Sequence, residues 1–446
     1  MTLTEAAYWF KRFGVIVGVI LGVVIITLLV VFYAPKQEAP PEYLSANCSC
    51  TDLKEDFLKE ELKLESLELG SGSELVFQVE TTTGQVDSLP KIINVYEFDN
   101  KGQSLSSQLQ ATEIANDLGF NPDGIIRKDA NTYVWLDTAR HRTLEIDART
   151  LNFTLTTDSD YIRDISSKSS IPSNSEAATL ATNVLRQANL LDEDYTKDNS
   201  LKDFTNIDIN PDGTYSKAPS AIDADLVRVD FKRRKSMISI RENIENAESI
   251  ISSLERKMID TDYIFTKDEE KVVYNDEKIT LYNFSTLILH QNPSHSNITV
   301  YVGPEDKEAE NTEHIYRIEY TNWPIKEFPC GTYELISPSE AIQKIQDGEG
   351  SLAYLVPQST GDSVVGYQPK TIKKFIIYEI TLAYYEPEEE ATFLQPIYTV
   401  TGDAFLENDE KADFVYYVPA INYDLVTNKV VQEETEETTD ENLLEL

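Results

Sequence analysis

The sequence predicts an α+β protein: a single N-terminal transmembrane helix followed by tandem small units, each made of one helix on an antiparallel sheet. Two observations lead to this expectation. An uncharged apolar run covers residues 14–33, and the chain that follows it is mostly polar and acidic. In that later part, segments with helical spacing of apolar residues are followed three times by segments in which apolar and polar residues alternate. Such alternation is typical of half-buried strands.

The apolar run has the length of a membrane-spanning helix. Gly14 to Tyr33 contains no charged residue, and about 20 helical residues cross the roughly 30 Å apolar layer of a bilayer. Lys11 and Arg12 precede the run, and basic residues beside a span stay in the cytoplasm. We expect a single-pass protein of the cell membrane with a cytoplasmic N-terminus and an extracytoplasmic body. A cleaved signal peptide is the alternative, although its apolar core is usually about 7–15 residues.

Glycines recur within this run at a spacing that favours contact between helices. Gly14, Gly18 and Gly22 fall on one helix face, where small side chains let a second helix approach closely. The partner would be a second copy of the chain or another membrane protein. The alternative is that glycine is simply frequent in membrane spans.

Composition and pattern divide the chain into segments. A Pro-rich stretch follows the apolar run and should be extended. Residues 433–446 carry seven acids and no base, which predicts disorder. The expected segments are a cytoplasmic tip (1–13), the transmembrane helix (14–33), a stalk (34–70), a first α+β unit (71–165), a second unit with an insertion (166–305), a third unit (306–425) and a disordered acidic tail (426–446).

The first unit has one helix followed by short strands. Leu105, Leu109, Ile114 and Leu118 lie on one helix side, and Gly119 ends the helix. The segments TYVWLDTA, TLEIDA and LNFTLTT then alternate between turn residues, which predicts antiparallel strands.

The second unit repeats this order and adds an insertion. Asn174 or Ser175 is the expected cap of a helix, and LVRVDFKRR follows that helix as a strand. The insertion starts with the basic cluster KRRK, residues 232–235, and continues into an amphipathic helix. The basic cluster either faces an anionic envelope polymer or a partner's acidic patch, or ends a strand where nearby acids pair with it.

The third unit opens with a complete helix-start signal. Ser337 is the expected N-cap, Pro338 occupies the first helical position, Glu340 stands at the third, and Gly348 ends the helix. Ser and Glu at this spacing form a capping box, in which each side chain bonds the other residue's backbone N–H.

Charge and cysteine content limit the classes of protein. With 77 acidic and 39 basic residues, the net charge is −38, which argues against binding nucleic acid because the phosphate backbone would repel the chain. Of the three cysteines, Cys48 or Cys50 could bridge to Cys330 in an oxidising compartment. Three free thiols are the alternative.

Residues that could carry chemistry are few. The four histidines His141, His290, His295 and His314 lack the spacing of a metal or catalytic motif. Asp208, Asn210 and Asp212 fit the first half of a calcium loop, yet Pro219 stands where a bidentate Glu is needed. The sequence NPDG, which occurs twice, is a strong turn former. We expect no catalytic residues, no metal and no cofactor.

The last quarter of the chain resembles a known family. The resemblance rests on YELISPSEAIQKIQDGEG, on a strand ending in Ala383-Tyr384-Tyr385, on Leu394-Gln395-Pro396-Ile397-Tyr398 and on FVYYVPAI. These pieces are similar to the C-terminal part of YycH/YycI-type extracytoplasmic regulators, which are single-span accessories of a sensor kinase with PepSY-like repeated units. The resemblance implies PepSY-like units here, one span, and a kinase as partner.

Topology, composition and resemblance favour a binding function. We expect a membrane-anchored, extracytoplasmic, non-enzymatic protein that binds and regulates another envelope or membrane protein, such as a sensor kinase or a peptidase. An envelope-structural or adhesive spacer protein is the alternative. A hydrolase ranks below both, since the sequence contains no recognisable set of nucleophile and base.

Overall fold

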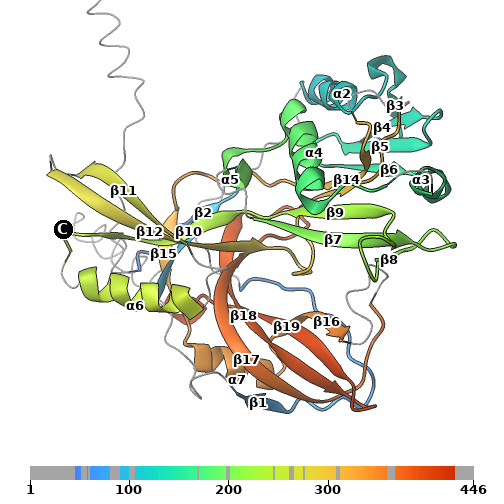
Figure 1. The fold of residues 1–446 in the computed structure, drawn as a ribbon. Helices are drawn as coiled ribbons and strands as arrows, with labels where there is room; N and C mark the ends of the chain where they lie inside the picture. Colours follow the sequence, from blue (N-terminus) through green and yellow to red (C-terminus); the bar gives the residue numbers. More distant parts are fainter. Residues whose placement is uncertain are drawn as a thin grey trace, which may run out of the picture. The chain divides into compact units, whose positions relative to one another are not determined.

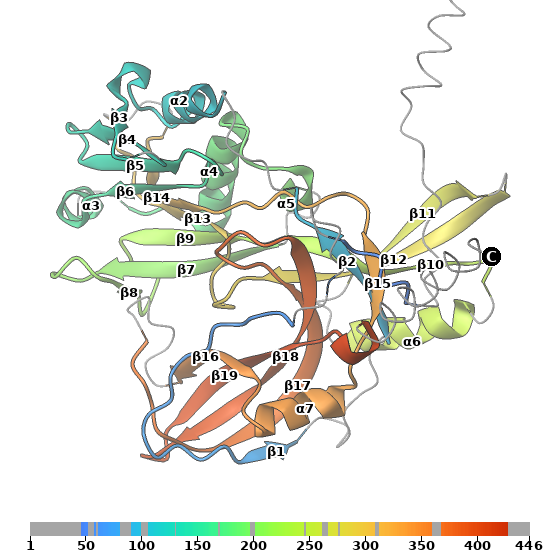
Figure 2. The same cartoon turned by 180° about the vertical axis from the view of Figure 1, so that it is seen from behind.

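Two large, mostly antiparallel sheets organise the part of the chain that the structure describes (Figures 1 and 2). All of the described residues except Tyr274 belong to one compact unit. The computed structural model describes residues 46–51, 58, 61–80, 91–99, 106–129, 131–167, 170–196, 201–244, 247–260, 266–274, 277–307, 312–358 and 367–426.

The first sheet has nine strands in the order β3-β4-β5-β6-β14-β13-β9-β7-β8. Every neighbouring pair is antiparallel. The strands are β3 (Ile126–Arg127), β4 (Thr132–Asp137), β5 (Arg142–Asp147), β6 (Phe153–Thr157), β7 (Lys202–Ile209), β8 (Tyr215–Lys217), β9 (Leu226–Phe231), β13 (Ile298–Val302) and β14 (Ile315–Tyr320).

The second sheet has ten strands, and its main path is β10-β12-β17-β18-β19-β16. Strand β17 pairs in parallel with both β1 and β12, and antiparallel with β18. The strands are β1 (Phe77–Val79), β2 (Ile92–Glu97), β10 (Arg234–Arg241), β11 (Thr266–Tyr274), β12 (Glu277–Leu289), β15 (Gly331–Glu334), β16 (Ser351–Pro357), β17 (Ile372–Tyr385), β18 (Phe393–Leu406) and β19 (Lys411–Pro419).

The helices cover the sheets. Helices α2 and α4 share one apolar core with the nine-stranded sheet, whereas α3 packs its Ile162 into a separate cluster with Ile207 and Tyr301. Helices α6 and α7 contribute to the core of the ten-stranded sheet. The helices are α2 (Ser107–Asp117), α3 (Ser159–Ser166), α4 (Asn174–Gln187), α5 (Glu193–Thr196), α6 (Ala247–Asp260) and α7 (Pro338–Gln346), with a 3₁₀ turn η1 at Pro122–Gly124.

The predicted fold class, tandem PepSY-like units of one helix on its own small sheet, is wrong. Strands that are far apart in the sequence pair directly: β6 with β14, and β2 with β15. Two helices, α2 and α4, also share a single core. The physical reason is that alternation specifies which face of a strand is buried, but many neighbouring strands can satisfy it. Long-range pairing therefore produced two large sheets rather than repeated small ones.

The transmembrane part of the predicted fold class is also corrected. Among the residues that the structure describes, no helix combines the length and the apolar character needed to cross a membrane. The run that was expected to span, residues 14–33 with Gly14, Gly18 and Gly22, lies outside the described residues, as does the acidic tail beyond Val426.

Three of the connections between the two sheets meet at one point, here called the junction. Lys232 and Arg233 connect β9 to β10, residues 290–297 (the junction loop) connect β12 to β13, and residues 321–330 connect β14 to β15. Backbone hydrogen bonds link these crossings. Ile288 N–H donates to Arg233 O at 3.0 Å, and Thr321 N–H donates to Asn297 O at 2.7 Å.

Candidate functional site

A buried ion pair, Arg233 with Glu386, lies at the centre of the junction. Arg233 is 1% exposed and Glu386 is 3% exposed. The Arg233 Nη2 group donates to Glu386 Oε1, and it also donates to the carbonyl oxygen of Trp323 at 2.9 Å. The guanidinium carbon lies 5.0 Å from the centre of the Tyr195 ring. Buried charges are tolerated when they are paired and hydrogen-bonded, so this arginine can hold three chain segments together.

Burial dominates the electrostatics of this centre. Burial raises the pKa of Glu386, an effect that Arg233 opposes. Burial also raises the pKa of the Tyr195 hydroxyl well above its ordinary value, and it raises the pKa of the Asp192 carboxyl. Tyr195 is therefore a neutral phenol at physiological pH and cannot act there as a base.

The basic cluster of residues 232–235 is largely occupied by acidic partners. Besides the buried arginine, Lys232 Nζ pairs with Asp203 and Lys235 Nζ lies 3.5 Å from Asp194 Oδ2. The sequence left two interpretations of this cluster open. The structure supports the one in which the cluster ends a strand and its basic side chains pair with nearby acids. An anion would have to displace these carboxylates.

The junction has hydrogen-bonding groups that the described residues do not use. Arg233 Nη1 lies 3.8 Å from Asp192 Oδ2, too far for a hydrogen bond. Among the described residues, Arg233 Nε and Nη1, Asp192 Oδ1 and Asn322 Oδ1 are buried atoms with no hydrogen-bond partner. Water can bridge buried donors and acceptors of this kind.

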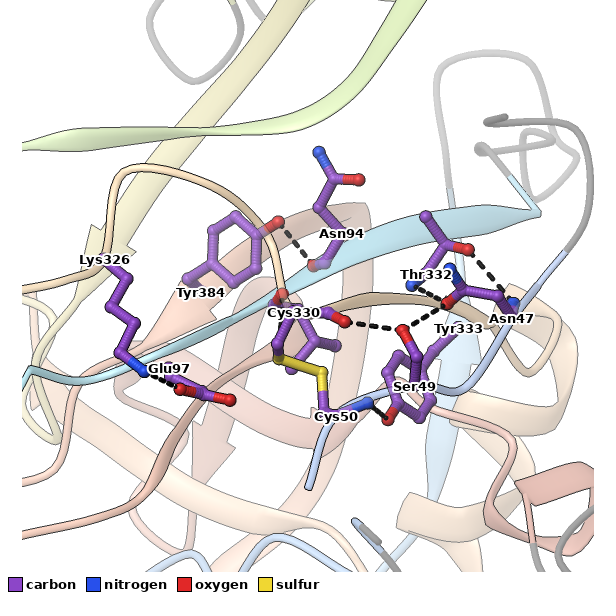
Figure 3. The surroundings of a disulfide bond; sticks show 11 residues. Asn47, Ser49, Cys50, Asn94, Glu97, Lys326, Cys330, Thr332, Tyr333 and Tyr384 are labelled. Atoms are coloured by element: carbon purple, nitrogen blue, oxygen red, sulfur yellow. Dashed lines mark hydrogen bonds and ion pairs between the residues drawn. A yellow bond between two sulfur atoms is a disulfide. The ribbon is translucent and has the colours of Figure 1, made fainter. Parts of the chain in front are cut away.

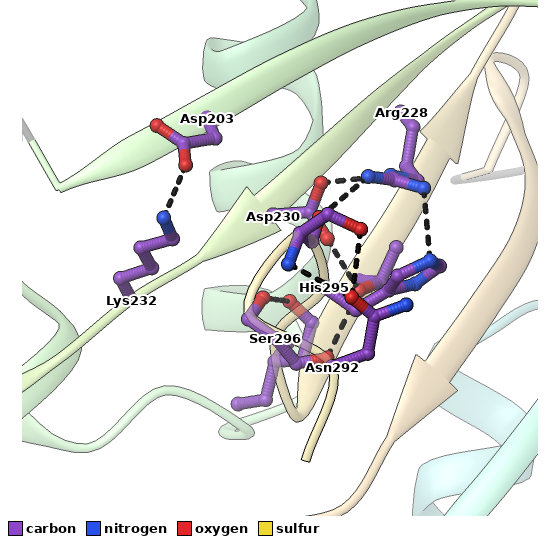
Figure 4. Close-up of polar contacts among 10 residues, drawn as sticks. Asp203, Arg228, Asp230, Lys232, Asn292, His295 and Ser296 are labelled. Carbon is purple, nitrogen blue, oxygen red and sulfur yellow. Dashed lines mark hydrogen bonds and ion pairs between the residues drawn. The ribbon is translucent and has the colours of Figure 1, made fainter. Parts of the chain in front are cut away.

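A second buried ion pair lies beneath the junction loop (Figure 4). On β9, Arg228 Nε donates to Asp230 Oδ2 at 2.8 Å, and the two residues are 1% and 0% exposed. Thr299 Oγ1 on β13 donates to the other carboxylate oxygen of Asp230 at 2.9 Å. Arg228 Nη2 also donates to the carbonyl oxygen of Ser294 in the junction loop at 2.7 Å. The pair therefore fixes the loop against the nine-stranded sheet.

Two of the four histidines are in the junction loop. His295 Nε2 lies 3.4 Å from Arg228 Nη1, and His290 Nε2 lies 3.3 Å from Glu388 Oε1. The hydroxyl of Tyr417 donates to His290 O at 3.0 Å. Both histidines therefore make contacts between the junction loop and the sheets on either side of it. Among the described residues, no group of three or more His, Cys, Asp or Glu side chains could hold a metal ion.

A disulfide joins the start of the described chain to the ten-stranded sheet (Figure 3). It links Cys50 to Cys330, with 280 residues of sequence separation. Ser49 Oγ donates to Cys330 O at 2.6 Å, and Cys50 N–H donates to the Tyr333 hydroxyl at 3.0 Å. Cys48 is a buried free thiol. Residues 46–50 are thus held both covalently and by hydrogen bonds.

The remaining candidate residues have structural roles where the structure describes them. Ser337 Oγ accepts from Glu340 N–H at 3.2 Å, and Glu340 Oε2 accepts from Ser337 N–H at 2.6 Å, so the capping box is present at the start of α7. In the second NPDG, Asp212 Oδ1 accepts from Thr214 N–H at 3.0 Å, and Gly213 has φ +84°. This geometry is that of a turn.

Comparisons with known proteins add little to this picture. No family model and no curated protein matches the chain. The chain is similar to the solved structure of an uncharacterized protein from Eubacterium rectale ATCC 33656, with a TM-score of 0.34 and 12% identity over 80% of this chain and 92% of that one. A likeness this distant supports no statement about function. The resemblance to YycH/YycI-type regulators stays a prediction.

Sequence reasoning did not single out the two buried ion pairs. A signal for one of them exists in LVRVDF, where Arg228 and Asp230 interrupt an apolar strand at alternate positions. Charges at this spacing share one face of a strand, and a charged residue is rarely buried without a partner. No local signal marks Glu386, because its partner is 153 residues away.

Proposed function

We propose that the chain is an exported, non-enzymatic protein that binds and regulates another protein of the cell envelope. The disulfide between Cys50 and Cys330 is the observation that carries this proposal. Disulfides persist in oxidising compartments outside the cytosol and are rare within it. The tie also fixes the N-terminal part of the described chain to the ten-stranded sheet.

The geometry of the buried charges supports a binding role over catalysis. Arg228 bonds to Asp230, and Arg233 bonds to Glu386. Each of these side chains is almost fully buried. Charges that neutralise each other in this way stabilise an architecture, whereas a catalytic acid or base must reach a substrate.

Strand β1 offers a surface that suits a protein partner. It pairs with β17 on one side, and no other described strand pairs with it. Leu75, Val76 and Val79 in and next to this strand are 44%, 47% and 39% exposed. An accessible strand edge with apolar side chains can accept an extended segment of another protein as an additional strand.

Site-specific photo-crosslinking tests this surface in cells. A crosslinking residue at Val76 should give one adduct with an envelope protein, and Val79→Lys should abolish that adduct. Ile222 is 94% exposed in the turn between β8 and β9, so the same crosslinker there is a matched control and should give none. Adducts between copies of the chain would favour the spacer alternative. The absence of any adduct at Val76 would contradict the proposed surface.

The non-enzymatic part of the proposal has a separate test. The purified chain should show no turnover of peptide, ester or glycan substrates. Reproducible turnover that is lost when a single acid or histidine is changed would overturn the non-enzymatic part of the proposal. The binding surface at β1 would still depend on the crosslinking result.

A further inference from the structure

The backbone of β1 and its neighbours divides its hydrogen-bonding groups between two sides. Toward β17, Glu74 N–H and Glu80 N–H donate to backbone carbonyl oxygens at 2.8 and 2.9 Å, and Val76 O accepts from a backbone N–H at 2.8 Å. Successive residues of a strand direct these groups to opposite sides. The residues whose N–H and C=O groups point away from β17 are therefore Leu75, Phe77 and Val79. No other described strand pairs with this side, here called the β1 edge.

The side chains next to the β1 edge are acidic at both ends. Alternation places four exposed residues on one face of the strand, and from first to last these are Glu74, Val76, Gln78 and Glu80. Neither glutamate makes an ion pair with a described residue. Lys374, the residue of β17 beside Val76, directs its ammonium over the Phe405 ring at 4.6 Å instead. The edge therefore presents two negative charges that no described residue neutralises.

A second copy of the chain fits the β1 edge poorly. If two β1 strands paired antiparallel about Phe77, Glu74 of each copy would lie opposite Glu80 of the other, because both are equally far from Phe77. In a parallel pair, each glutamate would lie beside the same glutamate of the other copy. Like charges directly opposite each other destabilise a strand pair, and the net charge of −38 adds repulsion between copies. The charges thus select against self-pairing.

We propose that the β1 edge binds an extended segment of a different protein, in which two basic side chains six residues apart bracket a short apolar run. This inference rests on the proposed function and specifies the chemistry of the partner at the same site. The segment adds as an antiparallel strand, which is the more stable pairing per residue. Its basic side chains lie opposite Glu74 and Glu80, and an apolar side chain lies opposite Val76.

The pairing geometry makes these contacts close. In an antiparallel pair, residues whose backbone groups point away from the partner strand have the shorter separation, with Cα atoms about 4.5 Å apart. Glu74, Val76 and Glu80 are such residues with respect to the added strand. On the other face, apolar side chains of the segment would cover Leu75 and Val79, which are 44% and 39% exposed.

Two matched peptides test the charge requirement on the full chain. The capped peptide Lys-Val-Thr-Val-Val-Val-Lys places its lysines opposite Glu74 and Glu80, and the control peptide has glutamate in place of both lysines. Changing two attractive cross-strand pairs into two repulsive ones should weaken binding about tenfold. Fluorescence anisotropy of the labelled peptides measures this difference. Equal affinity for the two peptides would overturn the inference.

Methylation of single peptide nitrogens tests whether the segment adds as a strand. With the lysines opposite the two glutamates, the central valine lies opposite Phe77, and its N–H donates to the β1 edge. N-methylation of that valine should therefore weaken binding about tenfold. N-methylation of the threonine is the matched control, because its N–H points away from β1, and it should leave the affinity nearly unchanged. Equal effects of the two methyl groups would contradict strand addition.

Charge reversal on the protein is the reciprocal test. Glu74→Lys combined with Glu80→Lys should reverse the preference, so that the glutamate peptide binds more tightly. Glu113→Lys combined with Asp123→Lys makes the same change in net charge at exposed positions in α2 and η1. This control should keep the preference for the lysine peptide. If it reversed the preference equally, overall charge rather than the β1 edge would set the specificity, and the inference would be wrong.

Sedimentation of the full chain tests the exclusion of a second copy. Glu74→Lys places opposite charges across an antiparallel pair of β1 strands, so this variant should form more dimer than the unmodified chain does. Dimers of the unmodified chain that Val79→Lys disrupts would overturn the inference, because a second copy would then occupy the β1 edge.

The failure of this inference can be distinguished from the failure of the proposed function. If Val76 crosslinks to an envelope protein whose contacted segment carries no basic side chains opposite Glu74 and Glu80, the proposed function stands and the inference about the partner's chemistry is wrong. If the peptides discriminate as expected but Val76 gives no adduct in cells, the β1 edge binds basic strands and the proposed envelope partner is wrong.

Discussion

The junction and the nine-stranded sheet use charged pairs in different ways. In the nine-stranded sheet, pairs such as Arg228–Asp230 and Arg317–Glu319 join residues two positions apart on one strand. At the junction, Arg233 reaches Glu386 across 153 residues, and the disulfide of the ten-stranded sheet spans 280. Local pairs satisfy charges on a single strand, whereas long-range ties decide whether distant segments stay together. Stability should therefore depend most on the few long-range ties.

Breaking the buried junction pair should have the largest effect. Arg233→Met leaves Glu386 buried without its partner, which should lower the free energy of unfolding by about 3–5 kcal/mol. Urea denaturation followed by circular dichroism measures this loss. The double variant Arg233→Met with Glu386→Leu removes both charges and should recover most of it. A loss below about 1 kcal/mol in the single variant would mean that the pair behaves like a surface contact.

Removing the disulfide should have the next largest effect. Cys50→Ser should lower the free energy of unfolding by about 2–5 kcal/mol, since the bond closes a long loop of the unfolded chain. Cys48→Ala is the matched control because Cys48 is a free thiol two residues away, and it should retain the bond. Denaturation with and without reductant compares the variants. If reductant leaves the unmodified chain's stability unchanged, the covalent tie contributes nothing.

The contrast between local and long-range interactions also explains which features could be predicted from the sequence. The start of α7 could be predicted, because Ser337 and Glu340 lie within one helical turn and the capping box depends only on these neighbouring residues. The strand LVRVDF could be predicted from its apolar residues. The neighbours β4, β5 and β6 pair in sequence order, as their turn-separated alternation predicts. The long-range partners could not be predicted, since β6 pairs with β14 and β2 with β15 across more than a hundred residues. Glu386 was missed for the same reason, because nothing near it in the sequence indicates a buried arginine.

A local cap should matter less than either long-range tie. Ser337→Ala should lower the free energy of unfolding by about 0.5–2 kcal/mol, through loss of the acceptor for Glu340 N–H. The hydrogen bonds with Ser337 lower the pKa of Glu340. The stability that ionised Glu340 contributes is therefore fully present above the ordinary pKa of glutamate. It is lost as the pH falls through the lowered pKa. Gln346→Ala, at an exposed position at the other end of α7, is the control. Equal effects of the two variants would argue against the cap.

The smallest effect should come from a surface pair of the nine-stranded sheet. Lys128 Nζ lies 3.1 Å from Glu145 Oε1, and the two side chains are 57% and 43% exposed. Water screens such a pair, and ordering two long side chains costs entropy, so Lys128→Ala should change the free energy of unfolding by about 0–1 kcal/mol. Added salt should reduce even that difference. If Lys128→Ala lowered the free energy of unfolding as much as Arg233→Met, burial and sequence separation would not determine how much a charged pair stabilises this protein. The contrast between the two regions would then be wrong.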